Sequence, residues 1–101
     1  MLIYSVTVNI QNDVMVDWLQ WMQSIHIQEV MNTKCFNSFT LRQIISPESE
    51  DESTTFNISY KCSDPKLLQE YFDNFAQELQ KRHSEKYEGK FVAFRTILKD
   101  I

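Results

Sequence analysis

Apolar residues in this chain recur at every second position, then at every third or fourth position, and this change of period happens twice. Residues 3–10, IYSVTVNI, alternate strictly, and the inward side chains of the predicted half-buried strand are Tyr4, Val6, Val8 and Ile10. From residue 14 the spacing is helical, and the predicted buried face comprises Val14, Trp18, Trp21, Met22 and Ile25. A chain that changes period in this way is expected to pack helices against a sheet.

The first predicted helix carries signals at both ends. Asn12 or Asp13 is expected to accept the first free amides, and Asn32 is expected to take the left-handed position that closes the helix. A second apolar cluster lies out of step with the first and comprises Ile27, Val30 and Met31. We therefore expect the helix to bend or restart near His26.

A hairpin is predicted next. Residues 36–45 are expected to form the second strand, and residues 54–62 the third strand with inward Phe56, Ile58, Tyr60 and Cys62. The run ESEDE between them is acidic and lacks any apolar period, so we expect it to be a solvated hairpin tip.

The second predicted helix has a strong start signal. Asp64 can cap the free amides, and Pro65 suits the first helical position because an amide N–H would be unpaired there anyway. The helix is predicted to run to about Tyr87, with a buried stripe of Leu68, Phe72, Phe75 and Leu79 flanked by Tyr71. Gly89, the only glycine, marks the turn before a last strand at residues 91–98.

The predicted order is therefore strand, helix, strand, strand, helix, strand. This order is typical of the ferredoxin-like βαββαβ sandwich, an α+β fold in which two helices cover one face of an antiparallel sheet. The length of 101 residues suits one domain, so residues 1–101 are expected to form a single ferredoxin-like domain. Cys35 and Cys62 lack the close paired spacing of a zinc or redox site, and we expect both to be reduced packing residues.

Composition argues against nucleic-acid and membrane partners. The net charge is -4 and the pI is near 5.0, whereas nucleic-acid-binding domains usually carry a basic stripe. The stretch GKFVAFR is similar to an RNA-stacking motif, but it lies on the fourth predicted strand, whereas RNA-recognition domains stack bases on the first and third. No segment approaches the about 20 apolar residues of a membrane span and the start lacks a signal peptide, so we expect a cytoplasmic protein.

The sheet face that points away from the helices is predicted from the alternation of each strand. Its expected members are Ser5, Thr7, Asn9, Ser38, Thr40, Arg42, Thr55, Asn57, Ser59, Lys61, Phe91, Ala93, Arg95 and Ile97. A polar antiparallel face can simply be open to water. Alternatively, the face closes against a second copy and encloses a polar cavity, and the alternation leaves both interpretations open.

Four side chains are candidates for ligand binding. His26 and His83 can act as a base or a ligand, although a partly buried histidine that fixes a helix end is the more common case. Arg42 and Arg95 are expected on the free sheet face, where arginine can bind a carboxylate or phosphate through two parallel hydrogen bonds, the alternative being an ion pair. Neither histidine belongs to an HxxxH or HExxH spacing, so no metal and no other cofactor is expected.

From end to end the chain resembles the bacterial family known as domain of unknown function 4286. The segments that carry the resemblance are YSVTVNI at the start, WLQWMQSIHIQEVM in the first helix and KFVAFRTIL at the close. The resemblance implies a homodimeric ferredoxin-like α/β barrel in which two sheets face each other, and it implies no established activity. Lys34 stands where the resemblance implies a glycine before the second strand, and Gln28 stands where a proline often follows the helix histidine.

Two classes of function remain open. The first is a non-enzymatic dimeric module that binds a small molecule or a protein partner, because no catalytic constellation is recognisable in the sequence. The second is an enzyme of the dimeric barrel class, such as a cofactor-independent monooxygenase or a haem-degrading protein. Similarity to haem-degrading relatives implies an asparagine on the first strand, a tryptophan on the third and a histidine on the second helix. Asn9 and His83 are loose counterparts, but the third strand has no tryptophan.

Overall fold

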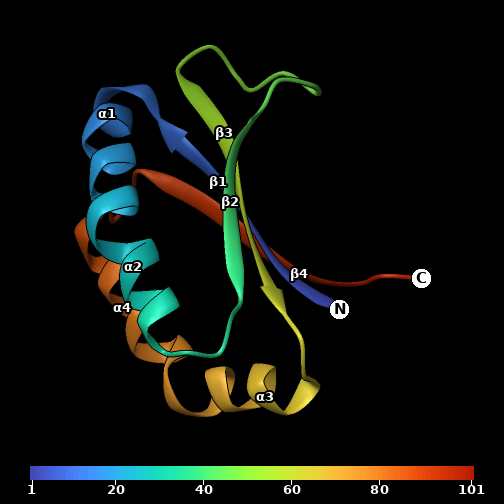
Figure 1. The fold of residues 1–101 in the computed structure, drawn as a ribbon. Helices are drawn as coiled ribbons and strands as arrows, with labels where there is room; N and C mark the ends of the chain where they lie inside the picture. Colours follow the sequence, from blue (N-terminus) through green and yellow to red (C-terminus); the bar gives the residue numbers. More distant parts are fainter.

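The computed structural model describes all 101 residues, Met1–Ile101. The strands form one 4-stranded antiparallel sheet in the order β2-β3-β1-β4, and the helices lie on one face of it (Figure 1). The strands are β1 (Leu2–Gln11), β2 (Ser38–Ile44), β3 (Ser53–Cys62) and β4 (Phe91–Lys99). The helical elements are α1 (Asn12–Trp21), the π-helix η1 (Met22–His26), α2 (Ile27–Asn32), α3 (Pro65–Asn74) and α4 (Ala76–Lys86). The predicted ferredoxin-like α+β fold is confirmed.

The first helical segment runs without interruption from α1 through η1 to α2. The restart expected near His26 is instead the π-helical turn η1. Such a turn accommodates one extra residue, which absorbs the phase difference between the two apolar clusters. Trp18, Met22, Ile27 and Val30 are consequently all buried, whereas Ile25, predicted on the buried face, is 47% exposed.

The predicted cap of this segment is wrong. The helix begins at Asn12, and no side chain caps its first amides. Oδ1 of Asn12 accepts a hydrogen bond from the Thr54 hydroxyl at 2.7 Å, and Asp13 pairs with Lys90 at 2.7 Å. Both candidate caps therefore bind side chains outside the helix.

The chain enters β2 through a residue in the left-handed conformation. This residue is Lys34, with φ of 65°, whereas Asn32, which was predicted to adopt that conformation, ends α2. A side chain is costly at positive φ and glycine is not, which explains why the family resemblance implies a glycine at this position. Gly89, with φ of 74°, makes the turn before β4 as predicted.

The second helical segment contains two helices, whereas the sequence predicts one. The predicted cap is confirmed, because Asp64 accepts a hydrogen bond from the Lys66 amide at 2.8 Å. The backbone leaves helical geometry at Phe75, and α4 runs in a different direction from α3 (Figure 1). The break shifts the phase of the buried stripe to Leu68, Tyr71, Ala76, Leu79 and His83. Phe75 and its neighbour Phe72 are only partly buried.

The strand register shows that the prediction for β4 is wrong by one residue. The inward residues of β1 and β3 are those predicted, among them Val8 and Ile58. On β4, Ala93 lies opposite Val8 and Arg95 opposite Val6, so both face the helices instead of the free face. Phe91 and Ile97 share this side, and the outer face instead carries Val92, Phe94, Thr96 and Leu98.

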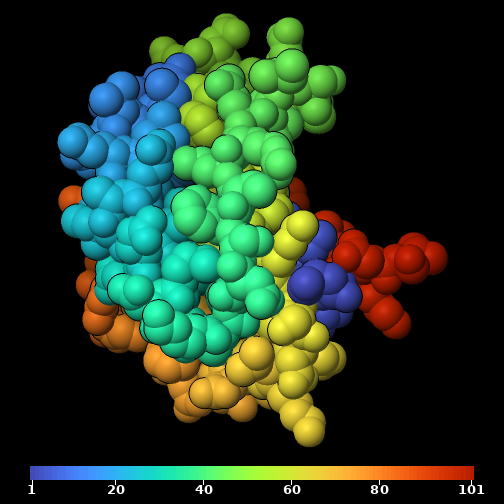
Figure 2. All heavy atoms as spheres, in the orientation of Figure 1, coloured from blue at the N-terminus to red at the C-terminus, as the bar shows by residue number.

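The core lies between the sheet and the helices. Trp18 and Ile58 are among its fully buried side chains, and Cys35 and Cys62 are buried and free, as predicted. The C-terminal end projects from the body of the molecule (Figures 1 and 2). None of the helices combines the length and the apolar character needed to cross a membrane.

Candidate ligand-binding cavity

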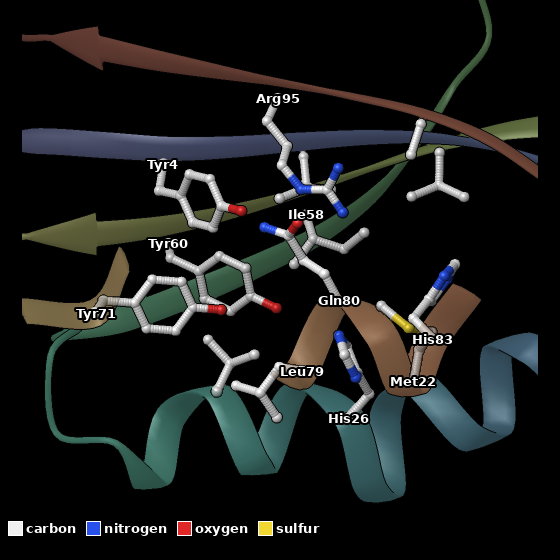
Figure 3. Close-up of a pocket in the computed structure, with 14 residues that line it drawn as sticks. Tyr4, Met22, His26, Ile58, Tyr60, Tyr71, Leu79, Gln80, His83 and Arg95 are labelled. Carbon is white, nitrogen blue, oxygen red and sulfur yellow. The ribbon is translucent and has the colours of Figure 1, made fainter. Parts of the chain in front are cut away.

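A small cavity lies between the sheet and the helical elements η1, α2 and α4 (Figure 3). Its volume is about 30 Å³, which is room for about two water molecules. Apolar side chains such as Val8, Met22 and Ile58 form much of the wall. The polar side chains in the wall are Tyr4, His26, Tyr60, Tyr71, Gln80, His83 and Arg95. The cavity wall contains no aspartate or glutamate.

The π-helical turn brings His26 to the cavity. His26 ends η1 and lies one turn after Met22, which also lines the cavity. Its ring stacks on the indole of Trp21, with ring centroids 4.9 Å apart. Nδ1 of His26 is buried and has no hydrogen-bond partner. Burial and the positive charges of Arg95 and Arg82 lower the pKa of His26 to about 4, so the ring is neutral at pH 7.

His83 is held beside His26 by the core. The indole N–H of Trp18 donates to Nε2 of His83 at 2.9 Å, and the ring of Phe91 meets the imidazole edge-on at 4.4 Å between centroids. Burial, followed by His26 and Arg95, lowers the pKa of His83 to about 4. Since Nε2 accepts a hydrogen bond, Nδ1 carries the proton of the neutral ring. The ring centroids of His26 and His83 lie 5.7 Å apart, and both imidazoles are uncharged at pH 7.

Arg95 reaches the cavity from the edge strand β4. Its guanidinium points into the same space as the side chain of Gln80 (Figure 3). The ion pairs of the structure involve Lys81, Arg82 and Lys90, and none involves Arg95. The cavity therefore holds one positive charge that no carboxylate of the chain neutralises.

Three of the four predicted ligand-binding candidates meet at this cavity. His26, His83 and Arg95 all line it, although Arg95 does so from the face opposite to the one predicted. Arg42 does not take part, because it lies opposite Asn57 on the outer face of the sheet. Its Nη1 donates to the hydroxyl of Thr40 at 2.7 Å.

The sequence interpretation missed the tyrosines and Gln80. Tyr4, Tyr60 and Tyr71 occupy core positions, and their hydroxyl groups point toward the cavity (Figure 3). Burial raises the pKa of all three phenols, so they remain protonated and can donate hydrogen bonds. A signal was present, since buried tyrosines usually need a partner for the hydroxyl group, but alternation alone marks them as packing residues.

The outer face of the sheet has two different halves. Over β1 and β3, the polar side chains bind one another: the amide of Asn57 donates to Ser5 at 2.8 Å, and the amide of Asn9 donates to Thr55 at 2.9 Å. Along β4 the face is apolar and exposed, with Val92 at 71% and Phe94 at 62%. The apolar half was not expected, because the sequence interpretation assigned these two residues to the core side.

The residues do not fit a haem group. Asn9 lies on the outer face of the sheet, whereas His83 faces the cavity on the helix side, so the two cannot flank one group within a chain. Nε2 of His83 is already occupied by Trp18. The cavity volume of about 30 Å³ is also far below that of a porphyrin.

Solved structures share the fold of this chain at low sequence identity. HapK from Hahella chejuensis superposes with a TM-score of 0.70 at 6% identity, covering 100% of this chain and 93% of that one. An ethyl tert-butyl ether d (ethd) family protein from Bacillus halodurans superposes with a TM-score of 0.69 at 15% identity, with 100% of both chains covered. A dimeric ferredoxin-like protein from an uncultured marine organism superposes with a TM-score of 0.70 at 8% identity, covering 100% of this chain and 95% of that one. At these identities the likeness shows the fold alone.

Sequence comparison is informative at the level of the family. No curated protein matches the chain. The family model described as "Domain of unknown function (DUF4286)" matches residues 1–101. Because this match spans the whole chain, the protein belongs to the DUF4286 family.

Proposed function

We propose that the protein is a homodimeric, non-enzymatic module that binds a small molecule in the cavity between its sheet and its helices. The observation that carries this proposal is His26, which lines the cavity and whose buried Nδ1 has no hydrogen-bond partner. Buried polar atoms in native proteins are almost always paired, so an unpaired one beside a cavity points to a missing partner. A ligand, or water that it displaces, supplies that partner.

The proposed dimer forms through the outer face of the sheet. Exposed apolar side chains along β4 favour removal from water, and the polar half of the face can be covered at low cost because Asn9 and Asn57 are already paired. The dimeric ferredoxin-like protein from the marine organism has the same fold. In such a dimer each chain keeps its own cavity on the helix side, instead of sharing a polar cavity between the sheets.

The remaining parts of the proposal follow from size and charge. Residues 1–101 act as one domain, because a single core joins the sheet to both helical segments. We propose that the protein has no nucleic-acid partner, since the net charge of -4 disfavours binding to phosphate backbones. The cytoplasm stays its proposed location.

Native mass spectrometry of the protein purified gently from its own host tests the proposal. We expect a dimer that carries a reproducible extra mass, and we expect Arg95→Ala to keep the dimer but lose that mass. A monomer would overturn the proposed assembly. A dimer with no extra mass, together with unchanged binding of added small molecules by Arg95→Ala, would overturn the proposed cavity.

An enzyme of the cofactor-independent monooxygenase type is the second candidate. The unpaired ring nitrogen of His26 favours it, because such a nitrogen can accept a proton in transit from a substrate whose own pKa is low; the pKa of about 4 makes His26 a weak base toward any less acidic substrate. Turnover of a ligand recovered by mass spectrometry, assayed with oxygen and then without it, tests this candidate. Loss of turnover in His26→Gln, with ligand binding retained, would favour the enzyme over the binding module.

A further inference from the structure

The charge balance of the cavity restricts the chemical class of ligand that can bind there. Arg95 contributes a guanidinium, both histidines are neutral, and no carboxylate lines the wall. The chain as a whole carries a net charge of -4, yet none of its acidic side chains pairs with Arg95. Locally the cavity therefore carries a single uncompensated positive charge.

The remaining polar groups are suited to donating hydrogen bonds. The phenols of Tyr4, Tyr60 and Tyr71 are protonated, and the amide of Gln80 can donate as well. Donors that converge on one guanidinium match a group that only accepts hydrogen bonds. An ionised carboxylate is such a group, and arginine binds it through two parallel bonds.

Size and access favour a carboxylate over a larger anion. A volume of about 30 Å³ accommodates a small planar head group. Arg95 lines the cavity and is also exposed to solvent, so its side chain marks the opening. A ligand can therefore place its head group inside while the rest of the molecule extends past β4. A phosphate dianion would bring two charges to a site with one arginine.

We propose that the ligand is a small organic acid whose carboxylate binds the guanidinium of Arg95 inside this cavity, next to the tyrosine hydroxyls and His26. This inference rests on the proposed small-molecule function and adds the chemical class of the ligand. The carboxylate neutralises Arg95, and the hydrocarbon part of the acid extends from the opening past β4.

The test compares acetate with acetamide, which has nearly the same shape and no charge. Two-dimensional NMR of the wild-type protein follows the Arg95 side-chain N–H and the ring signals of His26 and His83. We expect acetate to shift these signals in a saturable way, with an affinity at least about tenfold above that of acetamide. In Arg95→Gln we expect the affinity for acetate to fall at least about tenfold and the affinity for acetamide to stay the same.

Lys81→Gln is the matched control, because it removes one positive charge from the exposed side of α4 next to Gln80. It should bind acetate with the affinity of the wild type. If Lys81→Gln and Arg95→Gln lost the same affinity for acetate, the net charge of the protein would explain the loss, and the proposal would be overturned. If Arg95→Gln fails to fold, Arg95→Lys keeps the charge and should keep the preference for acetate over acetamide.

Two outcomes separate this inference from the proposed function. Equal affinity for acetate and acetamide, or no binding of acetate, overturns the carboxylate class. The proposed function is judged independently by the mass carried by the protein from its host. A neutral compound found there would support the small-molecule-binding module and would contradict the proposal that the ligand is a carboxylate.

Discussion

Trp18 and His83 are joined in the core by a hydrogen bond in which the indole Nε1 donates to the imidazole Nε2 at 2.9 Å. The bond connects α1 to α4 beside the cavity that His83 lines, and it leaves the His83 ring a single neutral tautomer. Protonation of His83 at Nε2 would break it, so the bond links helix packing to the charge state of the cavity.

Removal of this donor should destabilise the protein. Trp18→Phe leaves the buried Nε2 of His83 without a partner, which costs about 1–3 kcal/mol, and the smaller ring adds a cavity cost. Urea denaturation measures the loss. Trp21→Phe is the control, because Trp21 is only partly buried and stacks on His26 without bonding to His83. Equal losses in the two variants would show that the hydrogen bond contributes little.

Stability should fall as the pH drops from about 6.5 to about 4, because the folded histidines resist protonation. Their ordinary pKa is 6.5, and the folded values are about 4, so between these limits the unfolded chain binds more protons. The stabilisation is full above pH 6.5 and is lost toward pH 4, by as much as roughly 3 kcal/mol for each histidine.

Chemical denaturation at a series of pH values checks this dependence. The groups that face His26 are Arg95, Arg82, His83, Tyr4, Tyr60 and Tyr71, and only His83 among them titrates in the same range. His83→Gln should therefore flatten part of the slope. An unchanged slope in this variant would assign the acid sensitivity to carboxylates elsewhere.

The outer face of β4 should control assembly. Val92→Lys places a charge in the proposed interface, and we expect it to shift the protein from dimer to monomer without unfolding it. Val16→Lys is a matched control on α1, since Val16 is 73% exposed and Val92 is 71% exposed. Sedimentation analysis of the two variants measures the shift, and dimers in both would rule out this face as the interface.

The two aspartates near helix starts should differ in importance. Asp64→Ala removes a real cap and should cost about 1 kcal/mol, whereas Asp13→Ala removes an exposed ion pair with Lys90 and an exposed first-turn charge and should cost less, about 0.5 kcal/mol. Thermal and urea unfolding of both variants compare the losses. A larger loss in Asp13→Ala would contradict the structure at the start of α1.

Replacement of the left-handed lysine should stabilise the protein. Lys34→Gly relieves the steric cost of φ 65° and should raise the free energy of unfolding by up to about 1 kcal/mol, after the greater flexibility of glycine in the unfolded chain is subtracted. Lys81→Gly, in the interior of α4, should instead cost about 1 kcal/mol. A loss of stability in Lys34→Gly would show that the lysine side chain makes a contact that outweighs the strain.

The fold was predictable because most elements have an unambiguous period. From Tyr4 to Ile10 in β1 and from Thr55 to Cys62 in β3, apolar and polar residues alternate, so the inward faces were assigned correctly. In β4 both faces are apolar: Phe91, Ala93 and Ile97 alternate with Val92, Phe94 and Leu98. Alternation then does not show which face of β4 points toward the helices. Only the pairing with β1 shows that Arg95 faces them.

The candidate site was predictable only in part, since its geometry depends on features without a local signal. The phase shift before Ile27 indicates an irregularity, but it does not distinguish a bend from the π-helical turn that aims His26. The break at Phe75 has no glycine or proline to announce it, although it decides that His83 faces the core. The sequence therefore identified both histidines as candidates from their side-chain chemistry. It did not predict that the two side chains line the same cavity.

The register of β4 makes two surfaces interdependent. Neighbouring residues on one strand serve opposite sides, with Arg95 at the cavity and Phe94 on the outer face. A slip of a single position would put the arginine outside and the phenylalanine inside, because side chains alternate strictly along a strand. This strand should therefore tolerate conservative exchanges of side chains far better than any insertion or deletion, and a change of length here would damage assembly and ligand binding together.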